Sequence, residues 1–135
     1  MTFKRGIAGA FVAATSTAAL VLPAASPAQA AEIDLEAHLG PTAAFTHVHG
    51  EAEFEQQGSL REFNISIHRV RKLAGRTVVV RVHGTFVGRM RVHADGFAHM
   101  DRHAGVPGMS AGDVVRVRTK AGKLVTRGAL RVDTD

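Results

Sequence analysis

The chain contains no cysteine, tryptophan or tyrosine, and each absence excludes a class of protein. Without cysteine there is no disulfide framework of the kind that stabilises many small extracellular domains, and no thiol that could carry a lipid anchor. The fold must therefore depend on apolar burial and sheet hydrogen bonds. Seven phenylalanines are the whole aromatic content of the chain, so the Tyr and Trp platforms on which single-stranded nucleic acids stack are missing.

Residues 1–30 have the pattern of a secretory signal peptide. Lys4 and Arg5 precede an apolar run that hydroxyl residues interrupt, and residues 28–30 (Ala-Gln-Ala) form a small-x-small cleavage site. The run is weaker than the roughly 20 strongly apolar residues of a permanent membrane span, and no second such run follows it. We therefore predict a cleaved signal helix, a secreted protein without a membrane span, and one mature domain over residues 31–135.

Apolar and polar residues alternate with a period of two through most of residues 31–135, and no stretch keeps a helical period. Gly-containing turns separate the alternating segments. Strands are predicted over residues 33–39, 45–55, 60–71, 77–83, 86–93, 97–101, 114–119 and 123–132. Seven or eight short strands favour an all-β, antiparallel, Ig-like β-sandwich, with a small β-barrel as the alternative. The residues predicted to point inward are Phe63, Ile65, Ile67, Val78, Val80, Val82, Met90, Val92, Val115, Val117, Leu124 and Leu130.

A family resemblance covers about half of the predicted mature domain. It consists mainly of turn glycines and inward-facing valines, in residues 73–76, 78–84, 87–92, 110–117 and 124–130. In this pattern the chain resembles small exported bacterial β-sandwich proteins of the Ig-like type, a group of uncharacterised function. Because turn glycines and core valines specify a fold rather than a chemistry, the resemblance implies no catalytic residues.

Acidic and basic residues are distributed unevenly along the chain, whose net charge is +5. Residues 31–62 carry seven acidic residues and one basic residue, whereas residues 63–135 carry 14 basic and five acidic residues. Neighbouring acidic strands could neutralise the basic strands, or the basic strands could bind an anionic partner. For an exported protein, anionic cell-wall or extracellular polymers are the expected partners, rather than nucleic acid. The predicted basic outer face comprises Arg81, His83, Arg89, Arg91, His93, Arg116 and Arg118.

Eight histidines are a second unusual feature of the sequence. His47 and His49 lie two residues apart, so on a strand their imidazoles point to the same side, and Glu51 continues that side. Imidazole nitrogen together with carboxylate oxygen is a ligand set that suits Cu(II) or Zn(II). The spacing therefore predicts His47, His49 and Glu51 as the ligands of a divalent metal, with exposed histidines on a hydrated strand as the alternative.

A Gly-x-Ser-x-Gly motif over residues 108–112 matches the nucleophile elbow of hydrolases, in which a strand turns sharply into a helix. Here a predicted strand follows the motif, and no histidine comes after His103 to act as a base. We therefore predict that the protein is not an enzyme. The expected function is that of an exported binding or cell-surface-associated module that uses the basic face, with histidine-mediated Cu or Zn binding as the alternative.

Overall fold

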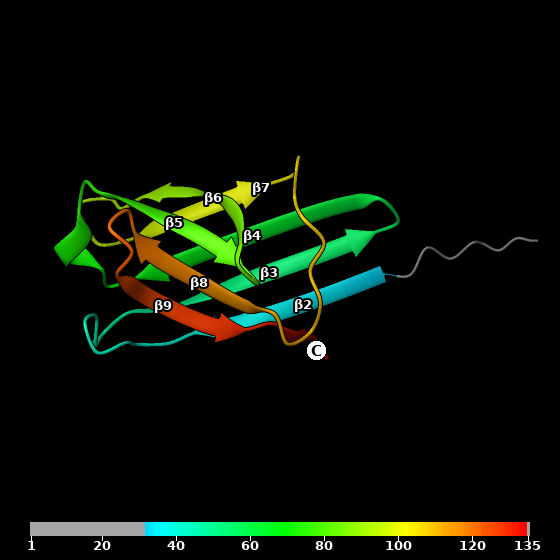
Figure 1. Cartoon of the computed structure of the whole chain (residues 1–135), viewed down its shortest axis with the longest axis horizontal. Helices are drawn as coiled ribbons and strands as arrows, with labels where there is room; N and C mark the ends of the chain where they lie inside the picture. Colours follow the sequence, from blue (N-terminus) through cyan, green and yellow to red (C-terminus); the bar gives the residue numbers. More distant parts are fainter. Residues whose placement is uncertain (1–31, 135) are drawn as a thin grey trace, which may run out of the picture. The chain divides into compact units, whose positions relative to one another are not determined.

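Strands form nearly all of the regular structure. The computed structural model describes residues 32–134, and the predicted signal peptide lies outside them (Figure 1). No helix in this range is long and apolar enough to cross a membrane. The elements are β2 (Glu32–Leu39), β3 (His49–Gln57), β4 (Leu60–His68), the short 3₁₀ helix η2 (Arg71–Leu73), β5 (Thr77–Val82), β6 (Thr85–Arg91), β7 (Ala98–Arg102), β8 (Val114–Thr119), β9 (Leu124–Ala129) and β10 (Arg131–Val132).

The strands form two antiparallel sheets whose inner faces share one apolar core. The five-stranded sheet has the order β10-β2-β3-β4-β7, and the four-stranded sheet has the order β6-β5-β8-β9. The chain changes from one sheet to the other before β5, before β7, before β8 and before β10. This topology confirms the predicted antiparallel β-sandwich over the small barrel.

The alternation in the sequence separates core from surface side chains with one exception. All residues predicted to point inward are buried except Leu124, which is half-buried. The register between β8 and β9 shifts because β9 contributes one extra residue, Val125, between the partners of Val117 and Arg118, so Val125 and Thr126 are the buried residues at this point. The Thr126 hydroxyl donates a hydrogen bond of 2.6 Å to the carbonyl oxygen of Gly40, which satisfies a polar group removed from water.

The predicted strand over residues 45–55 starts too early. Thr42 and Phe45 exchange two backbone hydrogen bonds, of 3.0 and 3.2 Å, and these close a loop ahead of the strand. Phe45 and Val48 are both buried, and their spacing of three residues breaks the period of two. As a result β3 begins only at His49, and His47 lies in the preceding turn.

The predicted strand over residues 123–132 is two strands in two different sheets. The chain changes sheet at the fully buried Leu130, so β9 pairs with β8 whereas β10 pairs with β2. Just before this point a Cβ atom at Gly128 would overlap the backbone carbonyl of His38 on β2. Glycine is therefore required here because β9 and β2 approach each other closely where the two sheets meet.

Candidate functional site

Opposite charges occupy the outer faces of the two sheets. Acidic side chains lie on the outer face of the five-stranded sheet, and we call this surface the acidic face. Arginines lie on the outer face of the four-stranded sheet, which we call the arginine face. The acidic face carries Glu32, Asp34, Glu36, Glu51, Glu53, Glu55, Glu62 and Asp101, and the arginine face carries Arg81, Arg89, Arg91, Arg116, Arg118 and Arg127.

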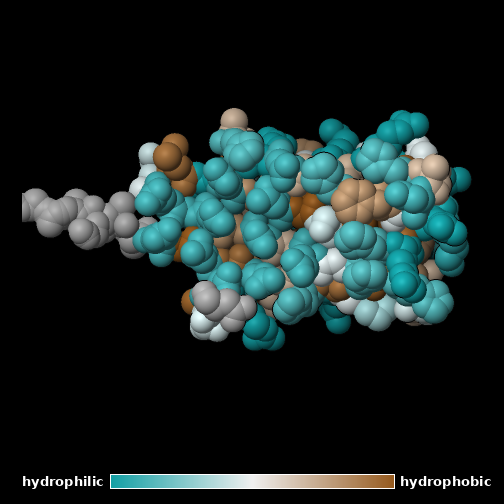
Figure 2. Space-filling model, turned by 180° about the vertical axis from the view of Figure 1, so that it is seen from behind, coloured by the Kyte–Doolittle hydropathy of each residue, from teal (hydrophilic) through white to brown (hydrophobic). Residues whose placement is uncertain are grey.

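The two sets of strands belong to different sheets, so strand pairing does not neutralise the arginines. The one face of the domain that Figure 2 shows, seen from behind, is mostly hydrophilic, with isolated apolar side chains. Each salt bridge within 4.0 Å in residues 32–134 involves a histidine, and none reaches an arginine of the arginine face. The arginine face therefore carries a concentrated positive charge that no carboxylate of the described residues neutralises through a salt bridge.

The strand register places the arginines directly beside one another. Arg81 on β5 lies opposite Arg116 on β8, and Arg116 lies opposite Arg127 on β9. Directly opposed residues have Cβ atoms about 5 Å apart, a distance at which like charges repel. An anion bound between these side chains would relieve that repulsion, so the row has the electrostatics of an anion-binding surface.

Phe86 lies exposed between two arginines of the same face. Its side chain is 41% exposed, and the guanidinium carbons of Arg81 and Arg89 lie 5.8 and 5.1 Å from its ring centroid. A register shift between Val80 and Arg81 accompanies this outward placement on β6. The cation–π contacts fix the two guanidinium groups around an apolar ring. Strand alternation alone did not single out this residue.

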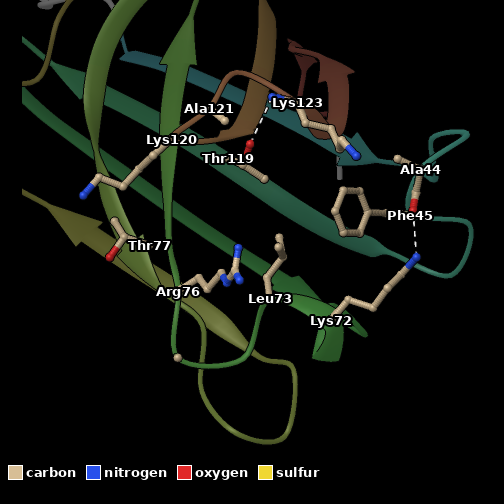
Figure 3. A pocket seen from close by; sticks show the side chains of 11 residues that line it. Ala44, Phe45, Lys72, Leu73, Arg76, Thr77, Thr119, Lys120, Ala121 and Lys123 are labelled. Atoms are coloured by element: carbon tan, nitrogen blue, oxygen red, sulfur yellow. Dashed lines mark hydrogen bonds between the residues drawn. The ribbon is translucent and has the colours of Figure 1, made fainter.

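A basic pocket of about 710 Å³ opens at the end of β5 and β8 (Figure 3). Phe45 and Leu73 provide apolar lining, and no acidic residue contributes to it. The Lys72 ammonium group lies 3.2 Å from the Ala44 carbonyl and 5.4 Å from the centre of the Phe45 ring. The sequence did not indicate this pocket, because its walls come from three separate segments. Its cationic residues are Lys72, Arg76, Lys120 and Lys123.

The two histidines predicted for the basic face lie outside the strands that form it. His83 occupies the turn between β5 and β6 with a φ of 51°, and its Nδ1 lies 3.6 Å from a carboxylate oxygen of Asp113. His93 follows the end of β6, and its ring stacks on Phe97 with 6.2 Å between the ring centroids. His83 comes directly after β5 and His93 comes two residues after β6, where alternation no longer sets the side-chain direction.

The predicted metal ligands are not brought together as one set. His47 lies in a turn, while the His49 imidazole stacks on His68 of β4, with ring centroids 5.0 Å apart and an interplanar angle of 13°. Glu51 instead belongs to a group of potential ligands with Glu36 and His38. Metal binding by His47, His49 and Glu51 stays a prediction, whereas the cross-strand neighbours place His49 beside His68 and Glu51 beside His38.

The Gly-x-Ser-x-Gly segment is a loop that leads into a strand, as its sequence context indicates. The Ser110 backbone N–H donates a 2.9 Å hydrogen bond to a carboxylate oxygen of Asp113, and the Asp113 N–H donates to the Ser110 carbonyl at 3.1 Å. β8 then begins at Val114. The sharp strand-to-helix turn that exposes a hydrolase nucleophile is therefore not the geometry of this segment.

Neither a protein-family model nor a curated protein matches this chain. The resemblance to exported Ig-like proteins therefore stays a prediction. Three surface features distinguish the domain: the arginine face, the basic pocket at its end, and the histidines beside the acidic face.

Proposed function

We propose that this protein is an exported, non-enzymatic binding module that holds anionic cell-wall or extracellular polymers on its arginine face. One observation carries the proposal: six arginines share one sheet face without a carboxylate in salt-bridge contact, while the acidic residues lie on the other sheet. On a solvated face without a partner, interspersed charges of both signs would make the folded domain more stable, because they attract one another. The segregation instead favours attraction of a polyanion.

The geometry of the sheet suits a repeating anion. Neighbouring strands lie about 4.8 Å apart, so the row formed by Arg81, Arg116 and Arg127 presents guanidinium groups at short, regular intervals. Guanidinium groups bind carboxylate, sulfate and phosphate oxygens through paired hydrogen bonds. The exposed ring of Phe86 adds an apolar surface against which a sugar ring can pack. An acidic polysaccharide can bind the guanidinium groups through its anionic groups and the Phe86 ring through its sugar rings.

The basic pocket extends the arginine face at one end. Thr77 lines the pocket and is also the cross-strand partner of Arg91, so it lies at the junction of the two surfaces. Beyond it, Arg76 and three lysines continue the positive charge. We infer that a bound chain can run along the arginine face and place a terminal anionic group in the pocket.

Binding to heparin, used as a probe polyanion, should weaken steeply with salt. Each arginine that contacts an anionic group releases condensed counterions, so raising the salt from 50 to 200 mM should lower the affinity at least about tenfold. Equilibrium binding measured at several salt concentrations gives the slope, and uncharged dextran serves as the matched control polymer. Equal binding to dextran, or heparin binding that salt leaves unchanged, would contradict the proposal.

A further inference from the structure

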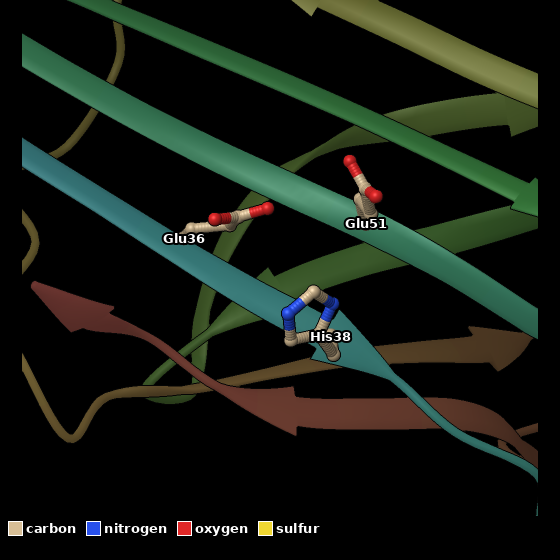
Figure 4. Close-up of side chains that lie close together, drawn as sticks. All are labelled: Glu36, His38 and Glu51. Carbon is tan, nitrogen blue, oxygen red and sulfur yellow. The ribbon is translucent and has the colours of Figure 1, made fainter. Parts of the chain in front are cut away.

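A group of potential metal ligands lies on the acidic face, on the opposite side of the domain core from the arginine face. His38 on β2 is directly opposite Glu51 on β3, and Glu36 lies two residues before His38 on the same face of its strand. The potential ligand atoms of these three side chains all lie within 4.8 Å of one another. Figure 4 shows the two carboxylates and the imidazole coming from the two neighbouring strands.

The surroundings of this group repel further negative charge. Glu53 lies opposite Glu36 and two residues after Glu51 on the same outer face, so the carboxylates of Glu36, Glu51 and Glu53 are close neighbours. Arg131 lies opposite Glu36 on β10, but no salt bridge within 4.0 Å joins these two side chains in the described structure. A bound cation would relieve the repulsion among these carboxylates.

We propose that Glu36, His38 and Glu51 bind a divalent first-row transition metal of the zinc type. Zinc binds imidazole nitrogen and carboxylate oxygen at about 2.0–2.2 Å, so the three side chains need only small rotations to close around one ion. His38 and Glu51 are exposed and Glu36 is half-buried, so the sheet leaves these rotations free. Three protein ligands leave a fourth position for water.

The imidazole determines which class of ion this set selects. Calcium and magnesium prefer oxygen ligands, so a single histidine adds little to the affinity of a site for them. Transition metals gain from imidazole nitrogen, and copper and nickel share this preference with zinc. The site should therefore bind zinc more tightly than magnesium. It shares no residue with the arginine face, so its failure would leave the proposed polymer binding untouched.

The stacked pair of His49 and His68 is the competing location for an ion. These rings lie on the same outer face as Glu51, and the two histidines line one hollow of about 480 Å³ with His38 and Glu51. Two opposed imidazoles also suit a transition metal. The two locations differ in their dependence on His38, and this difference makes the assignment testable.

Calorimetric titration of the full chain with zinc chloride tests the assignment. We expect one ion per chain with a dissociation constant on the order of 10 µM, and at least a tenfold loss of affinity in His38→Ala and in Glu51→Gln. The matched control is His103→Ala, because His103 also faces a carboxylate, Glu62, at 3.5 Å but belongs to no three-residue group among the described residues. The control variant should bind zinc as the unmodified protein does.

Three results would overturn the assignment. The first is unchanged zinc affinity in His38→Ala. The second is a loss of binding in the double variant His49→Ala/His68→Ala with His38→Ala unaffected, which would place the ion on the stacked rings. The third is magnesium binding as tight as zinc binding, which would mean that only the negative charge of the face attracts the ion.

Discussion

Replacement of Arg81, Arg89 and Arg91 by serine is expected to weaken heparin binding on the order of 100-fold near physiological salt. All three side chains are exposed on the arginine face and form no salt bridge there. An arginine near an anionic surface contributes about 1 kcal/mol. Three such losses correspond to about two powers of ten in affinity, since each factor of ten is about 1.4 kcal/mol. Fluorescence anisotropy with labelled heparin measures the change.

The matched control removes the same charge from other surfaces. Arg69, Arg71 and Arg131 are also exposed, but they lie after β4 and on β10 rather than on the four-stranded sheet. Their replacement by serine should weaken heparin binding less than about threefold, because only the long-range field changes. Equal losses in the two triple variants would show that net charge alone attracts the polymer, and would contradict a defined arginine face.

Replacement of Phe54 by alanine is expected to lower the free energy of unfolding by about 3–5 kcal/mol. Phe54 on β3 is directly opposite Phe63 on β4, and both side chains are 0% exposed. Truncation leaves a cavity in the layer between the sheets, and no disulfide compensates for it because the described chain has no cysteine. The total free energy of unfolding of a domain of this size is about 5–15 kcal/mol. The variant should therefore be close to unfolding at growth temperature.

The control for this prediction is Phe86→Ala, which removes the same ring from the surface. Phe86 is 41% exposed and contacts two arginines. Its replacement by alanine should therefore lower the free energy of unfolding by less than about 1 kcal/mol. Urea unfolding followed by circular dichroism gives both values. A cost below about 1 kcal/mol for Phe54→Ala would mean that the opposed rings do not form the centre of the core.

Strands β5 and β8 of the four-stranded sheet were predictable because each is short, alternating and bounded by a turn. Val78, Val80 and Val82 are buried while Arg81 is exposed, as a period of two requires. The same rule separates the core of β8 from its arginines. Where a strand has one face buried against a second sheet and no irregularity interrupts its alternation, as in β5 and β8, alternation along the strand is sufficient to assign core and surface.

Features that depend on contacts between segments were not predictable from the sequence. Val48 lies between two histidines and imitates strand alternation, but the loop closed by Thr42 and Phe45 holds His47 outside the sheet. The alignment of β2 with β3 places Glu51 beside His38, and no spacing along one strand reveals that register. The basic pocket was hidden for the same reason, since its walls come from three separate segments.

Mapping the bound polymer onto the two sheets tests the central claim most directly. Backbone amide signals are followed by ¹H–¹⁵N NMR during titration with a short heparin oligosaccharide. We expect the amides of β5, β6 and β8 to shift with saturating behaviour, while those of β2 and β3 stay in place. Shifts confined to β2 and β3, or shifts spread evenly over both sheets, would contradict polymer binding on the arginine face.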